Sequence, residues 1–294
     1  MGAPEPHRVA CGDVEIACFE WNPELRGRGP TLLLVHATGF HARCWDPVLA
    51  RMPAHHAVAV DMRGHGRSTN VPIEHWADLG RDLACVAEAL DLRDVVGVGH
   101  SMGGHALCDA AALAPDRFRR LVLLDPVIAS PDAYGGGWKI QMPEGEPHPT
   151  AKRKRHFDSP EAMIERFRDR DPYAGFTPDA LRAYCEHGLL PRDDGDGFDL
   201  ACPPEVEASV YMTSRTNPDV HASIRALAIP VLVVRAKLPP PDRTLMDFAS
   251  SPTWPALAGE FADGRDLHLA EHSHFLPMEI PERIAALVEE ELSA

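Results

Sequence analysis

Short apolar runs alternate with segments of helical periodicity along most of the chain, and this alternation restricts the fold more than any other feature. The runs are almost continuously apolar or β-branched, as is typical of strands that are buried on both faces. They lie at 31–35, 56–61, 95–99, 121–124, 230–234 and 266–269. The helical segments lie at 45–52, 76–90, 106–114 and 281–292. Buried strands separated by helices predict an α/β fold with a mostly parallel, doubly wound sheet.

The alternation stops after Pro126 and resumes near residue 227. Residues 130–226 are rich in proline, show helical patterns and contain no run typical of a buried strand. We therefore expect a core formed by 1–129 and 227–294, with 130–226 inserted as a helical cap over the site.

The charge of the chain narrows the set of expected partners. Asp and Glu number 44 against 29 Lys and Arg, which gives a formal net charge of −15. A surface that binds phosphates needs an excess of basic residues, so we expect neither nucleic acid nor an anionic membrane as a partner. The basic cluster at 152–155 has acidic neighbours, and we expect a solvated helix face there rather than an anion site. A small-molecule substrate is the expected partner; a homo-oligomer is neither indicated nor excluded.

The cellular compartment is predicted from the N-terminus and the cysteines. The first residues lack the basic segment and apolar stretch of a signal peptide, and no apolar run approaches the length of a membrane span. Seven cysteines are scattered along the chain without a CxxC pair: Cys11, Cys18, Cys44, Cys85, Cys108, Cys185 and Cys202. This pattern fits neither a zinc site nor a disulfide framework, so we expect mostly core cysteines in a reducing, cytoplasmic compartment.

The motif that carries chemistry is Gly99-His100-Ser101-Met102-Gly103, which stands between a predicted strand and a predicted helix. A sharp strand-to-helix turn needs small residues on both sides of a nucleophile, because the backbone there is crowded. Such a turn exposes the Ser101 hydroxyl and leaves the Met102 N–H at a helix N-terminus, where it can bind negative charge. A second donor is expected from the loop after the run at 31–35, and the Thr38 N–H is the candidate for this oxyanion hole.

These motifs resemble those of capped α/β-hydrolases of the serine carboxylesterase type. The matching segments are 36–40, 61–68, 99–104 and 274–282. The resemblance implies an α/β-hydrolase fold whose cap follows the sixth strand, with a serine–histidine–acid triad. One departure is Ala37, where relatives usually have glycine, and its methyl group is expected to narrow the oxyanion loop.

The resemblance places the catalytic histidine after the last strand, shortly before a Pro-Glu helix start. His274 has this spacing from Pro281, and we favour it as the general base. His272 is the other candidate and is expected to lie beside it.

The acid of the triad has two candidates. In many relatives it follows the penultimate strand, but here that strand leads into a proline run, and Asp242 comes about three residues late. Asp125 directly ends the run at 121–124, where some α/β-hydrolases carry their acid. We favour Asp125 and keep Asp242 as the alternative.

A serine nucleophile predicts acyl transfer. Dehalogenases and epoxide hydrolases of the resembling fold need Asp at position 101. We predict hydrolysis of a carboxylic ester of a small to medium, moderately hydrophobic substrate, with no metal and no organic cofactor. The alternatives are hydrolysis of a carbon–carbon bond, a lactone or an amide by the same triad, or a receptor with vestigial hydrolysis. An acidic dienone, the substrate of the carbon–carbon alternative, would need an anion clamp, for which the candidates are Arg153, Arg155 and Arg192.

Aromatic residues scattered through the predicted cap have two competing roles, as the lining of an apolar pocket or as the cap's own small core. They are Trp138, Phe157, Phe167, Tyr173, Phe176, Tyr184, Phe198 and Tyr211.

Overall fold

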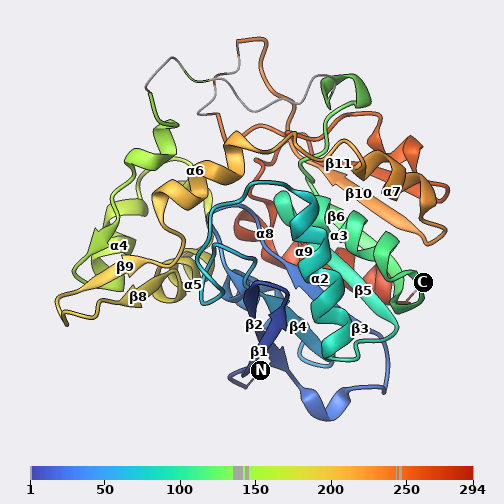
Figure 1. Cartoon of the computed structure of the whole chain (residues 1–294), viewed down its shortest axis with the longest axis horizontal. Helices are drawn as coiled ribbons and strands as arrows, with labels where there is room; N and C mark the ends of the chain where they lie inside the picture. Colours follow the sequence, from blue (N-terminus) through green and yellow to red (C-terminus); the bar gives the residue numbers. More distant parts are fainter. Residues whose placement is uncertain (1, 135–141, 143–145, 243, 245–246, 294) are drawn as a thin grey trace.

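An eight-stranded sheet runs through the centre of the computed structural model, which describes residues 2–134, 142, 146–242, 244 and 247–293 (Figure 1). Its strands are β1 (Glu5–Cys11), β2 (Val14–Trp21), β3 (Thr31–Val35), β4 (Ala57–Val60), β5 (Val95–His100), β6 (Phe118–Leu124), β10 (Val231–Arg235) and β11 (Gly264–His268). Their order across the sheet is β1-β2-β4-β3-β5-β6-β10-β11. β2 pairs antiparallel with β1 and β4, and the other neighbours pair in parallel. The mostly parallel sheet is confirmed, while the β1–β2 hairpin was not predicted.

Two apolar cores form because successive side chains of each central strand point to opposite faces. In β3, Leu33 and Val35 lie in one core, and Leu32 and Leu34 lie in the other. The helices outside residues 130–219 are α1 (Asp46–Leu49), α2 (Ala77–Ala89), α3 (Met102–Leu113), α7 (Val220–Ala226), α8 (Leu276–Glu279) and α9 (Pro281–Ser293). α2, α3 and α7 cover the first core, and α1 and α9 cover the second. The doubly wound arrangement is therefore present.

The segment expected as a helical cap contains helices and a small sheet. Its helices are α4 (Pro160–Phe167), α5 (Pro178–His187) and α6 (Pro204–Met212), and its strands are β7 (His156–Phe157), β8 (Leu189–Pro191) and β9 (Phe198–Leu200). The three strands pair antiparallel in the order β7-β9-β8. They were not expected, because two or three residues are too few to produce an apolar pattern. In Figure 1 α4, β8 and β9 form a lobe to the left of the main sheet. α7, at the end of the expected cap, packs instead against α3.

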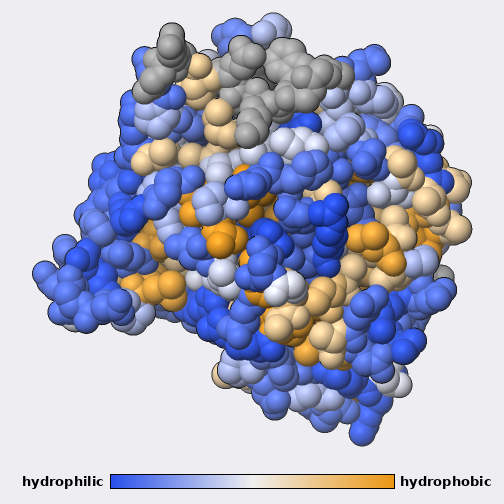
Figure 2. Space-filling view, viewed as in Figure 1, coloured by the Kyte–Doolittle hydropathy of each residue, from blue (hydrophilic) through white to orange (hydrophobic). Residues whose placement is uncertain are grey.

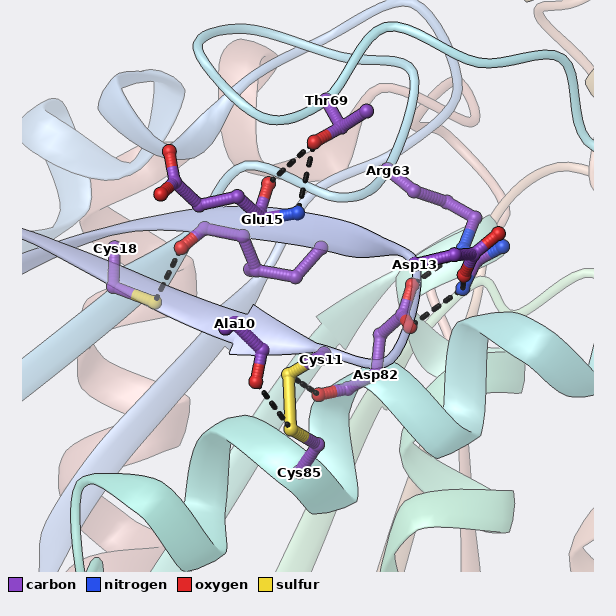
Figure 3. Close-up of a disulfide and its surroundings, with 10 residues drawn as sticks. Ala10, Cys11, Asp13, Glu15, Cys18, Arg63, Thr69, Asp82 and Cys85 are labelled. Atoms are coloured by element: carbon purple, nitrogen blue, oxygen red, sulfur yellow. Dashed lines mark hydrogen bonds and ion pairs between the residues drawn. A yellow bond between two sulfur atoms is a disulfide. The ribbon is translucent and has the colours of Figure 1, made fainter.

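One disulfide is present, although the scattered cysteines were expected to be mostly core residues in a reducing compartment and to form no disulfide framework. Cys11, at the end of β1, is joined to Cys85 of α2 across a sequence separation of 74 residues. Figure 3 shows the bond linking the N-terminal hairpin to the helix that lies beside it. The other five cysteines are free and buried. Disulfides are rare in reducing compartments, so this pair counts against the expected reducing environment.

The visible surface is mostly hydrophilic. Figure 2 shows blue side chains over most of this face, with apolar side chains gathered in smaller groups. Leu113 and Leu238 are the large apolar side chains that are exposed among the described residues. No helix within the described ranges is long and apolar enough to span a bilayer.

Removal of the disulfide is expected to destabilise the fold. The bond closes a long loop in the unfolded chain, so the Cys11→Ser/Cys85→Ser double variant should lose about 2–4 kcal/mol of unfolding free energy. Urea unfolding followed by circular dichroism measures the difference. Reductant should destabilise the wild type and leave the double variant unchanged; equal wild-type curves with and without reductant would contradict the linkage.

Candidate active site

Ser101 lies in the sharp turn between β5 and α3. Its φ of 57° and ψ of −117° form a backbone conformation that L residues rarely adopt. Two glycines make the turn sterically possible. A Cβ on Gly99 would lie 2.6 Å from the Gly103 carbonyl oxygen, and a Cβ on Gly103 would lie 2.4 Å from the Val35 carbonyl oxygen. The motif is therefore a consequence of close backbone packing between β5, α3 and the end of β3.

Three residues favoured from the sequence form one hydrogen-bonded chain. Ser101 Oγ lies 2.9 Å from His274 Nε2, and His274 Nδ1 lies 2.7 Å from Asp125 Oδ2. All three residues are buried, Asp125 completely. Ser101 follows β5, Asp125 follows β6 and His274 follows β11, so the carboxyl ends of parallel strands bring them to one edge of the sheet. A serine, an imidazole and a carboxylate in this order can perform nucleophilic acyl transfer.

The Asp125 carboxylate is held by several donors besides the histidine. Its Oδ1 accepts hydrogen bonds from the Ala236 N–H and the Thr253 hydroxyl, both at 3.1 Å, and from the Ser251 hydroxyl. Burial raises the pKa of Asp125, but the bonds from His274, Ser251 and the Ala236 N–H outweigh burial and bring it below its ordinary value. The carboxylate is thus kept ionised beside the imidazole. No sequence pattern marks Ser251 or Thr253, and their contribution was not predicted.

The alternative candidates lie in other surroundings. Asp242 is exposed. His272 Nδ1 lies 3.3 Å from Glu279 Oε1. The motif residue His100 is buried beside His274, and this burial is the main reason that the pKa of His100 is lowered to about 3. Its neutral ring donates from Nε2 to the His274 carbonyl oxygen at 2.8 Å, so His100 fixes the backbone of His274.

The two predicted oxyanion donors are available for an additional acceptor. Thr38 lies in the loop after β3, and Met102 is the first residue of α3. Within the part of the chain that the structure describes, no group accepts a hydrogen bond from either backbone N–H. Thr38 lines the same cavity as Ser101, and the Met102 N–H lies at the positive end of the helix dipole. Both groups can therefore bind negative charge that develops near the serine.

Two buried histidines shape the loop that carries Thr38. The Gly39 N–H donates to His65 Nε2 at 3.1 Å, and the Met62 N–H donates to His36 Nε2 at 2.9 Å. Burial lowers the pKa of both rings, that of His65 to about 4. Both imidazoles are consequently neutral near pH 7 and can accept these bonds.

A cavity of about 400 Å³ extends beside Ser101 and His274. Its lining is mainly apolar, and its aromatic members are Phe40, Trp76, Tyr134, Tyr211, Phe248 and Phe275. Of the described cap aromatics named above, Tyr211 lines the cavity. The others pack into an apolar cluster that also contains Phe40 and Phe275 from outside the expected cap: Phe157, Phe167, Tyr173, Phe176, Tyr184 and Phe198. Trp138 lies outside the described residues.

Charged residues near the site differ from the sequence expectation. The three arginines considered as anion clamps are ion-paired: Arg153 with Glu207, Arg155 with Glu205 and Arg192 with Asp194. The Arg153 side chain is only 23% exposed, so the expectation of a solvated face at 152–155 is wrong for this residue. Arg215 lines the cavity instead and has no carboxylate partner among the described residues. In those same ranges, no group of three His, Cys, Asp or Glu residues could hold a metal ion.

The sequence model of the alpha/beta hydrolase family matches residues 32–287. The chain belongs to this family. The hydrolase is 27% identical over 229 residues to a 2-(acetamidomethylene)succinate hydrolase of Mesorhizobium japonicum, with 76% of each chain aligned. An esterase of Mycobacterium tuberculosis is 30% identical over 171 residues, which cover 55% of this chain and 52% of that one. The crystal structure of an E-2-(acetamidomethylene)succinate hydrolase has a TM-score of 0.73 at 22% identity and covers 99% of this chain and 100% of that one. The predicted fold and hydrolase class are confirmed.

The folded hydrolase should lose stability as the pH falls from 6.5 towards 4, because His65 remains neutral in the fold while unfolded histidine binds a proton. Above pH 6.5 the histidine ring is neutral in both states and does not reduce the unfolding free energy. Below pH 6.5 the unfolded ring binds a proton that the folded ring does not bind, so the unfolding free energy decreases. Urea unfolding at about pH 7.5 and about pH 5 measures the change. His65→Gln should reduce the difference, and His75→Gln, at an exposed position, should not. Identical pH slopes for both variants would contradict the assignment.

Proposed function

We propose that this hydrolase cleaves carboxylic esters of small to medium, moderately hydrophobic substrates through an acyl-enzyme. The observation that carries the proposal is the hydrogen-bonded chain from Ser101 Oγ through His274 to Asp125, of which Ser101 and His274 line a largely apolar cavity. The similarity to a mycobacterial esterase supports the ester as the bond cleaved.

The groups of the site have distinct roles in the proposed reaction. His274 Nε2 accepts the Ser101 proton as Oγ attacks the ester carbonyl, and the N–H groups of Thr38 and Met102 stabilise the oxyanion. His274 then protonates the departing alkoxide, which leaves as an alcohol. Water, deprotonated by His274, attacks the acyl-enzyme and releases the carboxylic acid and free Ser101. Asp125 orients the imidazole and stabilises its protonated form.

The cavity supports the proposed substrate size. A volume of about 400 Å³ is at the lower end of the range for small-molecule sites and accommodates a short acyl chain with a compact alcohol. Phe40, Trp76 and Phe275 line it with aromatic surface. Burial of apolar substrate surface against these rings provides binding free energy, while Ser101 and Thr38 provide the polar contacts.

Asp125→Asn is expected to lower kcat for a short-chain aryl ester by about 1,000- to 10,000-fold, because the amide would favour the wrong tautomer of His274. Asp242→Asn removes an exposed carboxylate and should retain the wild-type kcat. Mass spectrometry should detect an acyl adduct on Ser101 of the wild type and none on Ser101→Ala.

Equal, mild losses for the two aspartate variants would reject the triad. A panel that includes lactones and carbon–carbon substrates separates the competing reactions. Saturable ligand binding without hydrolysis of any ester would favour a receptor.

Arg215 supports a second candidate, an ester or amide substrate that carries a carboxylate. Arg215 is one of the cavity-lining residues, and within the described ranges its guanidinium makes a 3.5 Å contact from Nη1 to the Ala133 carbonyl oxygen. Its other N–H groups have no acceptor among the described residues and could bind a carboxylate. The name of the Mesorhizobium japonicum relative specifies a substrate with an acetamido group and two carboxylates.

Arg215→Met should distinguish the two substrate classes. We expect kcat/KM for an aryl hemisuccinate to fall about 10- to 100-fold, since a charged hydrogen bond is lost, while kcat/KM for the matching neutral butyrate stays nearly constant. Arg166→Met, which removes an exposed arginine outside the cavity lining, controls for net charge. A proportional change for both esters would exclude Arg215 as a carboxylate clamp.

A further inference from the structure

A buried carboxylate of the cap segment lies against the loop that carries Thr38. A Cβ built on Gly39 would lie 2.7 Å from Glu207 Oε1 and 2.9 Å from Glu207 Cδ, so the carboxyl group packs directly on the Gly39 backbone. Glu207 belongs to α6 and is 5% exposed. The φ of Gly39 is +78°, which also favours glycine. The contact therefore depends on the absence of a side chain next to Thr38.

From this juxtaposition we propose that the Glu207–Arg153 ion pair positions the oxyanion loop, so that the cap segment holds the Thr38 N–H in its catalytic orientation. The inference rests on the proposed function, in which Thr38 stabilises the oxyanion. Glu207 and Arg153 are positioning residues in this scheme, because they act on the reaction through the loop backbone.

The loop is held from two sides at consecutive residues. On the core side, the Gly39 N–H donates to His65, and the Phe40 N–H donates to the Ala37 carbonyl oxygen at 3.1 Å. On the cap side, Glu207 contacts Gly39. The hydrogen bonds on the core side fix the backbone of the turn, and the Glu207 carboxylate prevents the turn from moving towards the cap.

Arg153 connects this carboxylate to a second contact with the loop. Its Nη1 donates to Glu207 Oε2, and its Nη2 donates to the hydroxyls of Tyr184 at 3.0 Å and Tyr173 at 3.1 Å. The Tyr184 ring centroid lies 5.0 Å from that of Phe40. One guanidinium therefore fixes both the carboxylate on Gly39 and the ring on Phe40.

Burial separates this pair from an ordinary surface ion pair. The free-energy cost of removing two charges from water offsets much of their mutual attraction, so such a pair contributes little to stability. Its presence is better explained by the geometry that it imposes on the neighbouring loop. A second pair, Arg155–Glu205, joins the same chain segments with side chains that are 39% and 57% exposed. It provides a matched control, because it links Arg155 to α6 and the three atoms nearest to a Cβ on Gly39 all belong to Glu207.

The test compares Glu207→Gln and Arg153→Lys with the controls Glu205→Gln and Arg155→Lys. Each variant is assayed for kcat and KM on a short-chain aryl ester and for the rate of Ser101 phosphonylation by a p-nitrophenyl phosphonate. Phosphonylation needs the oxyanion donors but no ester turnover. Circular dichroism and melting temperature identify variants that fail to fold. If only one of Glu207→Gln and Arg153→Lys folds, that variant suffices for the test.

Glu207→Gln keeps the shape of the side chain and removes its charge. We expect kcat and the phosphonylation rate to fall together, by about 10- to 100-fold, with KM changed less than about threefold, since misplacement of one oxyanion donor costs up to about 1,000-fold. The surface variants should match the wild type. A folded Glu207→Gln and Arg153→Lys with wild-type kcat and phosphonylation, or with an increased KM alone, would show that the pair only fastens the cap.

The phosphonate also separates this inference from the proposed function. If the wild type is phosphonylated but hydrolyses no ester, the ester proposal fails while the ratio of phosphonylation rates still decides the role of Glu207. If Ser101 of the wild type does not react at all, both proposals fail.

Discussion

Close packing of backbone around Ser101 is the constraint on which the site depends. The strained φ of this residue persists only because β5 and α3 are fixed by the sheet and by the core beneath α3. Neither Gly99 nor Gly103 has room for a Cβ, because the atoms that a Cβ would meet belong to the backbone and cannot move aside. A second strained position, Asp125 with φ 48°, ends the adjacent strand. The parallel sheet thus supports two unfavourable conformations side by side, and these bring the hydroxyl and the carboxylate to opposite sides of one imidazole.

Electrostatics in the site rest on keeping one buried group charged and several buried rings neutral. Asp125 remains ionised because it accepts hydrogen bonds from four groups. Burial lowers the pKa of His36, His65 and His100, so these rings provide hydrogen bonds without adding positive charge. A cation near His274 would disfavour protonation of its ring. The neutral histidines therefore fix the loops without adding positive charge beside the Ser101–His274–Asp125 hydrogen bonds.

The sequence predicts features that depend on local pattern and misses those that depend on distant contacts. Buried strands and the turn at Ser101 have periodicity and glycine spacing as signals, and Asp125 could be favoured because it directly ends a strand. Ser251 follows Asp125 by 126 residues, and no local pattern connects them. The Cys11–Cys85 bond and the Arg153–Glu207 pair are likewise formed between segments that meet only in the folded chain. The basic cluster at 152–155 shows the limit clearly: its charges indicate solvent exposure, whereas tertiary packing leaves the Arg153 side chain only 23% exposed.

The division of aromatic residues explains why substrate identity is harder to predict than reaction class. Most described cap aromatics are used to pack the cap against the end of the sheet, where Tyr184 meets Phe40. The cavity takes its aromatic surface largely from segments outside the cap lobe, including Trp76 and Phe275, and its charged side chains are Arg215 and Asp247. Reaction class follows from one turn in the sequence, whereas substrate choice depends on side chains gathered from several separate segments. If Arg215 is the proposed carboxylate clamp, its exchange for an apolar residue changes the preferred substrate while the Ser101–His274–Asp125 hydrogen bonds and the loops around them stay the same.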